Sequence, residues 1–183
     1  MKYTSEVFQR LSRGQFISSN SIDSETRAIF NDIEDCQQEY EDYFSQIDFQ
    51  LCAGDGFYYF SRREPKVIIE NKLQSLFSWI DYLDFLKTYD TTFDGGTQFS
   101  LAQMEVSLST NMELKEKLAR LFREKTSNRE KLEALAGVLV GIGFAEQVNE
   151  EESVYQVTSA FHYIEQIIMC INIDEEAKDE IPQ

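Results

Sequence analysis

The sequence FQLCAGDGFYYFSRR, residues Phe49–Arg63, decides how the rest of the chain is interpreted. Two short runs rich in aromatic and apolar residues, Phe49–Ala53 and Phe57–Ser61, flank the tripeptide Gly54-Asp55-Gly56. Glycine reaches positive φ without steric cost, so a Gly-Asp-Gly sequence between two such runs predicts a β-hairpin. An ordinary hairpin in some other α+β domain would leave the same local pattern.

The second run of this hairpin carries four large rings. Because successive strand residues point to opposite faces, Phe57 and Tyr59 are expected on one face of the hairpin and Tyr58 and Phe60 on the other. Large rings on both faces predict that neither face lies open to water.

Composition places the chain among proteins with a real hydrophobic core. The chain has 183 residues, of which 42% are hydrophobic and 13% aromatic, enough for one domain or two small ones. No apolar run approaches the roughly 20 residues needed to span a bilayer, and the first residues lack the apolar core of a signal peptide. The cysteines are odd in number and widely spaced, which favours a reducing cytoplasm: Cys36, Cys52 and Cys170.

Charge is high and unevenly distributed. The net charge of −16 predicts repulsion from DNA and from anionic membranes for the chain as a whole. Asp23–Asp48 holds nine acids and one base, whereas Glu113–Lys131 holds seven bases and four acids. The last residues, 174–183, are acidic and are expected to form a disordered tail.

Helical patterns surround the hairpin. The spacing of apolar residues predicts a short helix over 3–13, then a short strand at 15–17. An amphipathic pattern with an acidic face runs over 25–47 and fits one helix or two. After the hairpin, residues 66–89 form a long predicted helix with two apolar stripes, which indicates burial on two sides.

The same order of elements recurs in the second half. Gln98-Phe99 echoes Gln15-Phe16, and helices are expected over 101–108, 112–122 and from Asn128 to a glycine at 141 or 143. Ser127 is the expected N-cap of that last helix, with Glu130 as its capping-box partner. A second hairpin and a closing helix complete the order, over residues 144–148, 154–159 and 161–173.

Helix, helix and hairpin is the order of a winged helix, with the hairpin as the wing. The predicted fold is therefore α+β, mainly α, with two winged-helix modules joined by a long helix. The expected boundaries are a first module over 1–64, a linking helix over 65–93, a second module over 94–173 and the tail over 174–183.

The sequence carries no motif of catalysis or cofactor binding. No glycine-rich phosphate loop is present, and the single histidine, His162, lies in an apolar helical pattern where a structural role is expected. Asp32, Glu34 and Asp35 could be a metal-binding cluster, but an acidic run on an amphipathic helix is usually its solvated face. The prediction is a protein without enzymatic activity and without a cofactor.

These elements resemble a known family over nearly the whole chain. LSRGQFI at Leu11–Ile17, EYEDYF at Glu39–Phe44 and DGFYYFSRR at Asp55–Arg63 are similar to the bacterial condensin subunit MukE and its shorter MksE-type relatives. The second half fits through Phe99–Gln103 and the helix REKLEALAGVLVGIGF at Arg129–Phe144. The motifs of the first half are moderately specific, and those of the second half are generic.

The resemblance implies a tandem winged-helix protein that is not an enzyme. Such a protein would form a homodimer and bind a MukF-like kleisin, which bridges the heads of an SMC-type ATPase. The complex would be cytoplasmic and nucleoid-associated. It would act in chromosome condensation and segregation, or in plasmid defence in the related Wadjet-type systems.

One departure from the family concerns DNA. The last helix of the second module tends to be basic in the family, whereas Ala134–Gly143 is apolar and uncharged here. DNA contact is therefore expected to be weak and to fall on the preceding basic segment. Its candidate residues are Lys115, Lys117, Arg120, Arg123, Lys125, Arg129 and Lys131. A solvated helix with alternating charges is the alternative interpretation.

The first hairpin is the predicted kleisin-binding surface, through Phe57, Tyr58, Tyr59 and Phe60. One face is expected to pack on the helices of its own module, and the other to be free for the partner. The acidic face between Asp32 and Asp48 would attract a basic kleisin segment. The alternative is that both faces are buried within a dimer.

A free-standing winged-helix transcription regulator is the competing function. It would need a basic recognition helix, because phosphate contacts supply most of the affinity for DNA. The corresponding helix of the first module, Cys36–Ile47, carries acids and no base. Neighbouring genes would distinguish the two functions.

Overall fold

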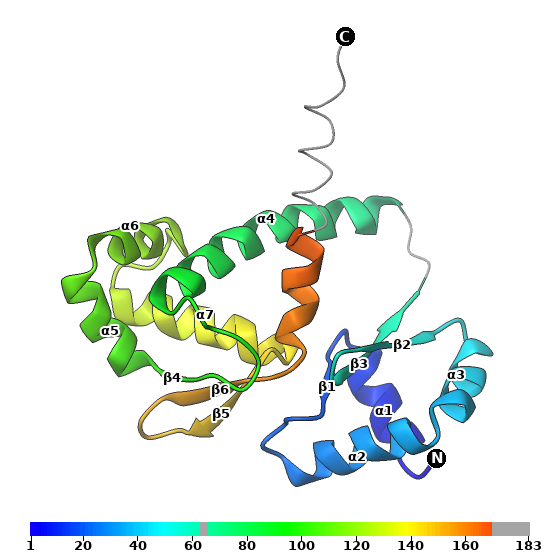
Figure 1. Ribbon diagram of the computed structural model, residues 1–183. Coiled ribbons are helices and arrows are strands. Elements are labelled where there is room, and N and C mark those ends of the chain that lie inside the picture. The colour runs from blue at the N-terminus through cyan, green and yellow to red at the C-terminus, as the bar shows by residue number, and fades with distance from the viewer. Residues whose placement is uncertain (63–65, 170–183) are drawn as a thin grey trace.

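The computed structural model describes residues 1–62 and 66–169, with side chains described from residue 76 onward in the helix that begins at Lys66. The chain is a mainly helical α+β protein with two small antiparallel sheets (Figure 1). The α+β fold class is thus confirmed. Residues 170–173 of the expected closing helix, the expected tail over 174–183 and the expected boundary near residue 64 lie outside the described residues.

The N-terminal half places three helices around a three-stranded sheet. Its elements are α1 (Thr4–Leu11), β1 (Ile17–Ser18), α2 (Ser24–Asp35), α3 (Gln37–Ser45), β2 (Gln50–Gly54) and β3 (Phe57–Ser61). The pattern over 25–47 forms two helices, because Cys36 leaves the helical region with φ −125° and ψ 30°. The strand expected at 15–17 begins only at Ile17, so Gln15 and Phe16 precede it.

The predicted first hairpin is present, and β3 is its central strand. The strand order is β1-β3-β2, and Ile17 pairs with Tyr58 while Cys52 pairs with Tyr59. Gly56 turns the chain between β2 and β3 with φ 76°, which is the left-handed region that glycine adopts at little cost. Its carbonyl accepts a hydrogen bond from the Ser19 amide at 2.9 Å. This bond continues the β1–β3 pairing beyond Ser18.

The C-terminal half repeats the strand order of the first sheet. Its elements are α4 (Lys66–Tyr89), β4 (Gln98–Ser100), α5 (Leu101–Thr110), α6 (Met112–Arg120), α7 (Asn128–Ile142), β5 (Ala145–Asn149) and β6 (Val154–Val157), followed by helical residues 161–169. The sheet order is β4-β6-β5. Ser127 and Glu130 form the expected capping box of α7, and Gly143 ends that helix with φ 94°.

Two hydrophobic cores hold these elements together. The N-terminal core is built around residues such as Ile29, Ile33, Tyr40 and Phe44, which are all fully buried. The C-terminal core is larger and takes its side chains from α4 to α7 and from residues 161–168. In α4, Leu83 from one predicted stripe and Trp79 and Leu86 from the other are all buried in this core. Their own chain therefore covers both stripes in this part of the helix, whereas Phe77 is 70% exposed.

The hairpin β2–β3 contributes to both cores. Tyr58 is buried in the N-terminal core and Phe60 packs against it, whereas Phe57 is buried in the C-terminal core and Tyr59 packs against that one. The predicted alternation of the four rings is therefore confirmed. Because the strand has one face on each core, it joins the two halves of the molecule.

Candidate interaction surfaces

The expectation that one face of the first hairpin is free is wrong in this structure. Phe57 is 1% exposed and Tyr58 is 4% exposed. Tyr58 packs on Phe30 with ring centroids 5.1 Å apart, and its face is the one directed to the N-terminal core. The opposite face meets the C-terminal half of the same chain, which the sequence did not indicate. Tyr59 and Phe60 remain half-buried.

The junction between the halves is built around Phe16. Its ring lies 5.7 Å from Phe57, 5.1 Å from Phe144 and 5.0 Å from Tyr163, measured between centroids. Tyr59 completes the cluster, and burial together with the nearby Cys52 and Tyr163 raises the pKa of Tyr59 to about 12. Rings at these distances pack favourably, so the cluster holds the halves together.

Residues of the loop after β1 form hydrogen bonds across the same junction. The Asn20 side chain donates to the Val157 carbonyl at 3.2 Å and accepts from the Ser159 amide at 2.8 Å. The Glu146 carboxylate accepts from the Ser21 hydroxyl and from the Ile22 amide, both at 2.6 Å. The two halves are therefore joined by specific hydrogen bonds as well as by apolar packing.

The candidate DNA-contacting residues differ in accessibility. Lys131 is 7% exposed, and its ammonium donates to the carbonyls of Leu118, Ala119 and Leu121 at 2.7 to 3.3 Å. These hydrogen bonds satisfy backbone carbonyl groups at the C-terminal end of α6, and the buried ammonium is not accessible to a phosphate. The sequence-based assignment of Lys131 to a DNA surface is therefore wrong. The signal that could have revealed this is its place within the apolar spacing of α7.

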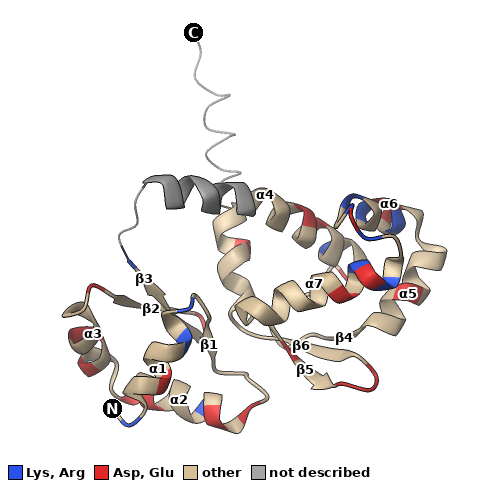
Figure 2. Ribbon diagram, turned by 180° about the vertical axis from the view of Figure 1, so that it is seen from behind, with Lys and Arg blue, Asp and Glu red and all other residues tan. Residues whose placement is uncertain are grey.

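Two further bases are held in ion pairs. Lys117 lies 2.8 Å from Asp84 and 2.9 Å from Glu113, and Arg129 lies 2.8 Å from Glu133. The four remaining candidates are exposed and form no ion pair within the described ranges: Lys115, Arg120, Arg123 and Lys125. Figure 2 shows basic residues gathered around α6 and the loop after it.

Acidic residues dominate the surface of α2 and α3, as the sequence predicted (Figure 2). Asp32 has a structural function here, because its carboxylate accepts from the Tyr40 hydroxyl at 2.6 Å and from the Lys2 amide at 2.8 Å. Burial alone would raise the pKa of Asp32, but these hydrogen bonds lower it below its ordinary value. Glu34 and Asp35 are exposed, and the structure does not bring them together with Asp32 as a donor cluster within the described residues.

Two grooves border α3. An open groove of about 870 Å³ separates it from the hairpin β2–β3, and a smaller one of about 420 Å³ lies between α1 and α3. Phe8, Tyr43 and Ile47 line the smaller groove and are 37% to 47% exposed. The sequence placed Phe8, Tyr43 and Ile47 among the apolar stripes of the helices, because periodicity does not reveal which residues of a stripe lie at its edge.

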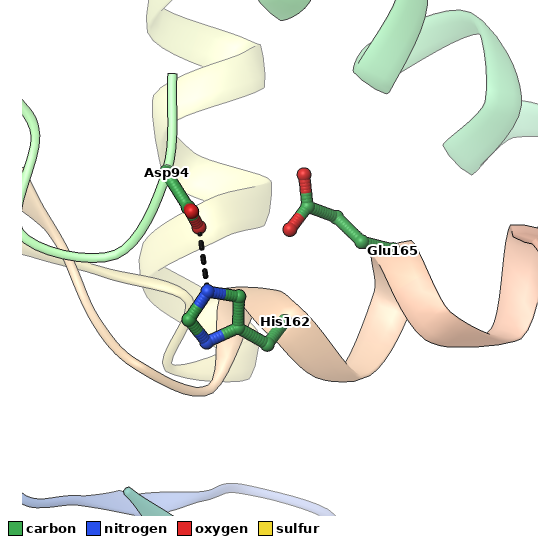
Figure 3. A group of neighbouring side chains, drawn as sticks. All are labelled: Asp94, His162 and Glu165. Atoms are coloured by element: carbon green, nitrogen blue, oxygen red, sulfur yellow. Dashed lines mark ion pairs between the residues drawn. The ribbon is translucent and has the colours of Figure 1, made fainter. Parts of the chain in front are cut away.

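One group of side chains has the composition of a metal site. His162 Nε2 lies 2.8 Å from Asp94 Oδ1, and Glu165 points toward the same pair (Figure 3). The potential ligand atoms lie within 4.8 Å of one another. However, the Lys87 ammonium is 2.6 Å from Glu165 Oε1 and would oppose a dication there. The group fits two polar contacts that hold residues 161–169 in place: His162 contacts Asp94 in the loop after α4, and Glu165 contacts Lys87 in α4. This arrangement agrees with the structural role expected for His162.

Across the part of the chain that the structure describes, no helix combines the length and the apolar character needed to cross a membrane.

Comparison with known proteins gives a family assignment. No curated protein matches the sequence. The family described as "Condensin complex protein MksE" matches residues 2–168 of the 183. The chain belongs to the MksE family of condensin complex proteins.

Proposed function

We propose that this chain is a non-catalytic subunit that binds the kleisin of an SMC-type bacterial condensin, of the MukBEF, MksBEF or Wadjet type. The observation that carries the proposal is the family match over residues 2–168. The partner would be a MukF-like kleisin, and through it an SMC-like ATPase. The complex would act on the nucleoid in the cytoplasm, in chromosome condensation and segregation or in defence against plasmids.

The repeated order of elements supports an interpretation of each half as a winged-helix module. Both sheets place the last strand of the half in the centre, as β1-β3-β2 and β4-β6-β5. In both halves helices precede a hairpin, and in this proposal the hairpins β2–β3 and β5–β6 are the wings. Long α4 links the modules, and its exposed Phe77 is available to a second copy in a homodimer.

The predicted kleisin contact through the first wing is retained for its two half-buried rings. Tyr59 and Phe60 line an open pocket of about 390 Å³ together with residues 11–14 and with Tyr163. Phe57 and Tyr58 are buried, so in this proposal they stabilise the hairpin and do not contact the partner. Aromatic residues at such positions commonly dominate binding energy.

Co-purification with the kleisin tests the function. The kleisin and SMC-type genes are expected beside the gene for this chain, and co-expression with that kleisin should give one complex on size-exclusion chromatography with light scattering. The mass is expected to correspond to two copies of this chain in the complex. Separate elution of the two proteins at micromolar concentration would contradict the proposal.

The biological role is tested separately from assembly. Deletion of the gene should disturb nucleoid segregation if the complex acts on the chromosome, and should raise plasmid transformation if it acts in defence. A fluorescent fusion is expected on the nucleoid, and this localisation should be lost when the kleisin gene is deleted.

A further inference from the structure

Four bases on α6 and the loop after it are available to an anion. Among the described side chains from residue 76 to residue 169, the other lysines and arginines are buried or held in ion pairs: Lys87, Lys117, Arg129 and Lys131. The available bases are exposed and form no ion pair within the described ranges: Lys115, Arg120, Arg123 and Lys125. We refer to these four as the α6 basic surface, and Figure 2 shows the basic residues of this region. The exposed acids Glu116 and Glu124 lie in the same stretch, and they leave its charge positive.

A stretch of the opposite charge follows the described part of the chain. Residues 174–183 contain five acids and one base, Lys178, and have a net charge of −4. The acids are Asp174, Glu175, Glu176, Asp179 and Glu180. We refer to residues 174–180, which lie outside the described residues, as the acidic segment. The chain therefore carries a counter-charge for the α6 basic surface in its own sequence.

The helical residues that lead toward the acidic segment contact the same part of α4 as α6 does. Glu165 lies 2.6 Å from Lys87 of α4, measured between the charged atoms. Lys117 of α6 lies 2.8 Å from Asp84 of α4. Asp84 and Lys87 are three positions apart, which is about 4.5 Å along a helix axis and less than one turn. The acidic segment is thus connected to a helix whose neighbour across α4 carries the basic surface.

The intervening chain is long enough to bring the acids to these bases. Met169 follows Glu165 by four helical residues, about 6 Å along the axis. Asp174 and Glu180 follow Met169 by five and eleven residues, which span at most about 17 Å and about 38 Å when extended. A helix such as α4 is about 10 Å across with its side chains. The acidic segment can therefore pass α4 and reach α6 while every described element keeps its place.

We propose that the acidic segment binds the α6 basic surface of the same chain and shields it from DNA. Carboxylates and DNA phosphates compete for the same lysine and arginine side chains. The segment is covalently attached, so its effective concentration at the surface is in the millimolar range, and a phosphate must displace it. The chain alone then binds DNA more weakly than its exposed bases would allow. This inference concerns the chain by itself and does not depend on the kleisin.

Zero-length cross-linking tests the contact in the full chain. A carbodiimide joins a carboxylate to a lysine amine without a spacer, and mass spectrometry then identifies the joined residues. The ion pair of Lys117 with Glu113, at 2.9 Å, is the internal standard for reactivity. Cross-links from Lys115 or Lys125 to the acidic segment are expected at low salt, and they should be lost at about 1 M salt, where exposed charges are screened.

A mixture of isotope-labelled and unlabelled chains shows whether the contact lies within one chain. The expected cross-links join residues with the same label. Cross-links that join only differently labelled chains would place the segment on a second copy and overturn the inference. The absence of any such cross-link, while the internal standard reacts, would overturn it as well.

Binding of a short DNA duplex of random sequence, measured by fluorescence anisotropy, tests the shielding. The first variant lacks residues 174–183, which removes a net charge of −4. The matched control makes the same charge change on exposed residues of the N-terminal half: Glu34→Gln/Asp35→Asn/Asp42→Asn/Asp48→Asn. A third variant combines the deletion with Lys115→Gln/Arg120→Gln/Arg123→Gln/Lys125→Gln. Circular dichroism verifies that every variant is folded.

Deletion of residues 174–183 should tighten DNA binding by about fivefold or more at low salt, while the control should stay within about twofold of the wild type. The third variant should lose the gain. Equal gains from the deletion and the control would reduce the effect to general charge and overturn the inference. A gain that persists without the four bases would place the effect on another surface and overturn it too. Failure of the deletion variant to bind DNA more tightly would overturn the shielding, even where the cross-links form.

Discussion

At the scale of single residues, Lys131 shows how a charge can serve the fold rather than a ligand. Its ammonium is buried and satisfies three carbonyls at the end of α6. Lys131→Met keeps the length of the side chain but leaves these carbonyls without a donor. We expect a loss of about 2 kcal/mol in the free energy of unfolding, measured by urea denaturation.

Lys125→Met is the matched control for this prediction. Lys125 is exposed, so its removal should change stability by less than about 0.5 kcal/mol. Equal stability of the two variants would show that the carbonyls of α6 find other partners when Lys131 is absent.

Asp23 gives a residue-scale prediction that depends on pH. Its carboxylate caps α2, and the hydrogen bonds from the Thr26 hydroxyl and from the amides of Thr26 and Glu25 lower its pKa below the ordinary 3.8. A lowered native pKa contributes stability that is present above the ordinary pKa and is lost as pH falls through the native value. Asp23→Ala should therefore cost about 1 kcal/mol at neutral pH and progressively less in acid.

Asp23→Asn separates the cap from the charge. Asparagine also accepts from the first turn of a helix and does not titrate. The advantage of Asp23→Asn over Asp23→Ala should stay constant between about pH 7 and pH 3, whereas the advantage of the wild type should shrink. Unfolding curves at several pH values measure both differences, and a wild-type advantage that does not vary with pH would contradict the assignment.

At the scale of elements, the first hairpin connects the two halves because its rings pack in both hydrophobic cores. Tyr58 is 4% exposed and packs on Phe30, so Tyr58→Ala should cost about 3 kcal/mol in the free energy of unfolding. The sequence alone placed Tyr58 on the predicted kleisin-binding surface, where its removal would not affect the core. Tyr43→Ala is the comparison, because Tyr43 is 47% exposed and its loss should cost less than about 1 kcal/mol. Thermal unfolding of the two variants would contradict this prediction if their midpoints coincided.

Local patterns were sufficient to predict most elements but not their surroundings. Glycine and ring alternation predicted the hairpin, and Ser127 with Glu130 predicted the start of α7, because these signals depend on neighbours in sequence. What covers a face depends on residues far along the chain. For this reason the packing of Phe57 against the C-terminal half and the burial of Lys131 could not be read from the sequence.

The same distinction, between local sequence patterns and contacts with distant residues, applies to the candidate sites. The acidic surface of α3 was predictable, since a helix with one apolar stripe exposes its other residues. The groove beside it was not, because its second wall comes from β2, after a turn whose backbone determines the separation of the two walls. Likewise Asp94 was no candidate partner for His162, since 68 positions separate them and no motif connects them.

At the scale of the whole molecule, the junction should make the two halves unfold together. Phe16 contacts Phe57, Tyr59, Phe144 and Tyr163, so Phe16→Ala removes the centre of the cluster. We expect a loss of about 2 kcal/mol and a separation of one thermal transition into two. Differential scanning calorimetry measures both effects.

Phe8→Ala provides the control for this experiment, because the Phe8 ring packs on Phe44 and Phe49 within the N-terminal half. It should lower stability without separating the transitions. A single transition in Phe16→Ala, shifted no further than in Phe8→Ala, would show that the hydrogen bonds of Asn20 and Glu146 suffice to couple the halves.

The distribution of charge over the molecule predicts weak binding of DNA by the chain alone. Only four of the seven candidate bases are exposed without an ion pair in the described ranges: Lys115, Arg120, Arg123 and Lys125. Reversal of these four to glutamate should abolish a gel shift that the wild type gives only at low salt, because few phosphate contacts are available. Reversal of Lys117 and Arg129 together should have a smaller effect on that shift. Unchanged binding after the fourfold reversal would exclude this surface.

The contacts of Asn20 can form only late in the synthesis of the chain. Its partners Val157 and Ser159 follow it by 137 and 139 positions, so they leave the ribosome long after the N-terminal half. Until then the rings of Phe16, Phe57 and Tyr59 lack their packing partners from the C-terminal half, such as Tyr163. This interval, several seconds at about 5–20 residues per second, is when a chaperone or a second nascent chain has access to those rings. Slow codons between β3 and β5 would lengthen the interval, and rapid translation would shorten it.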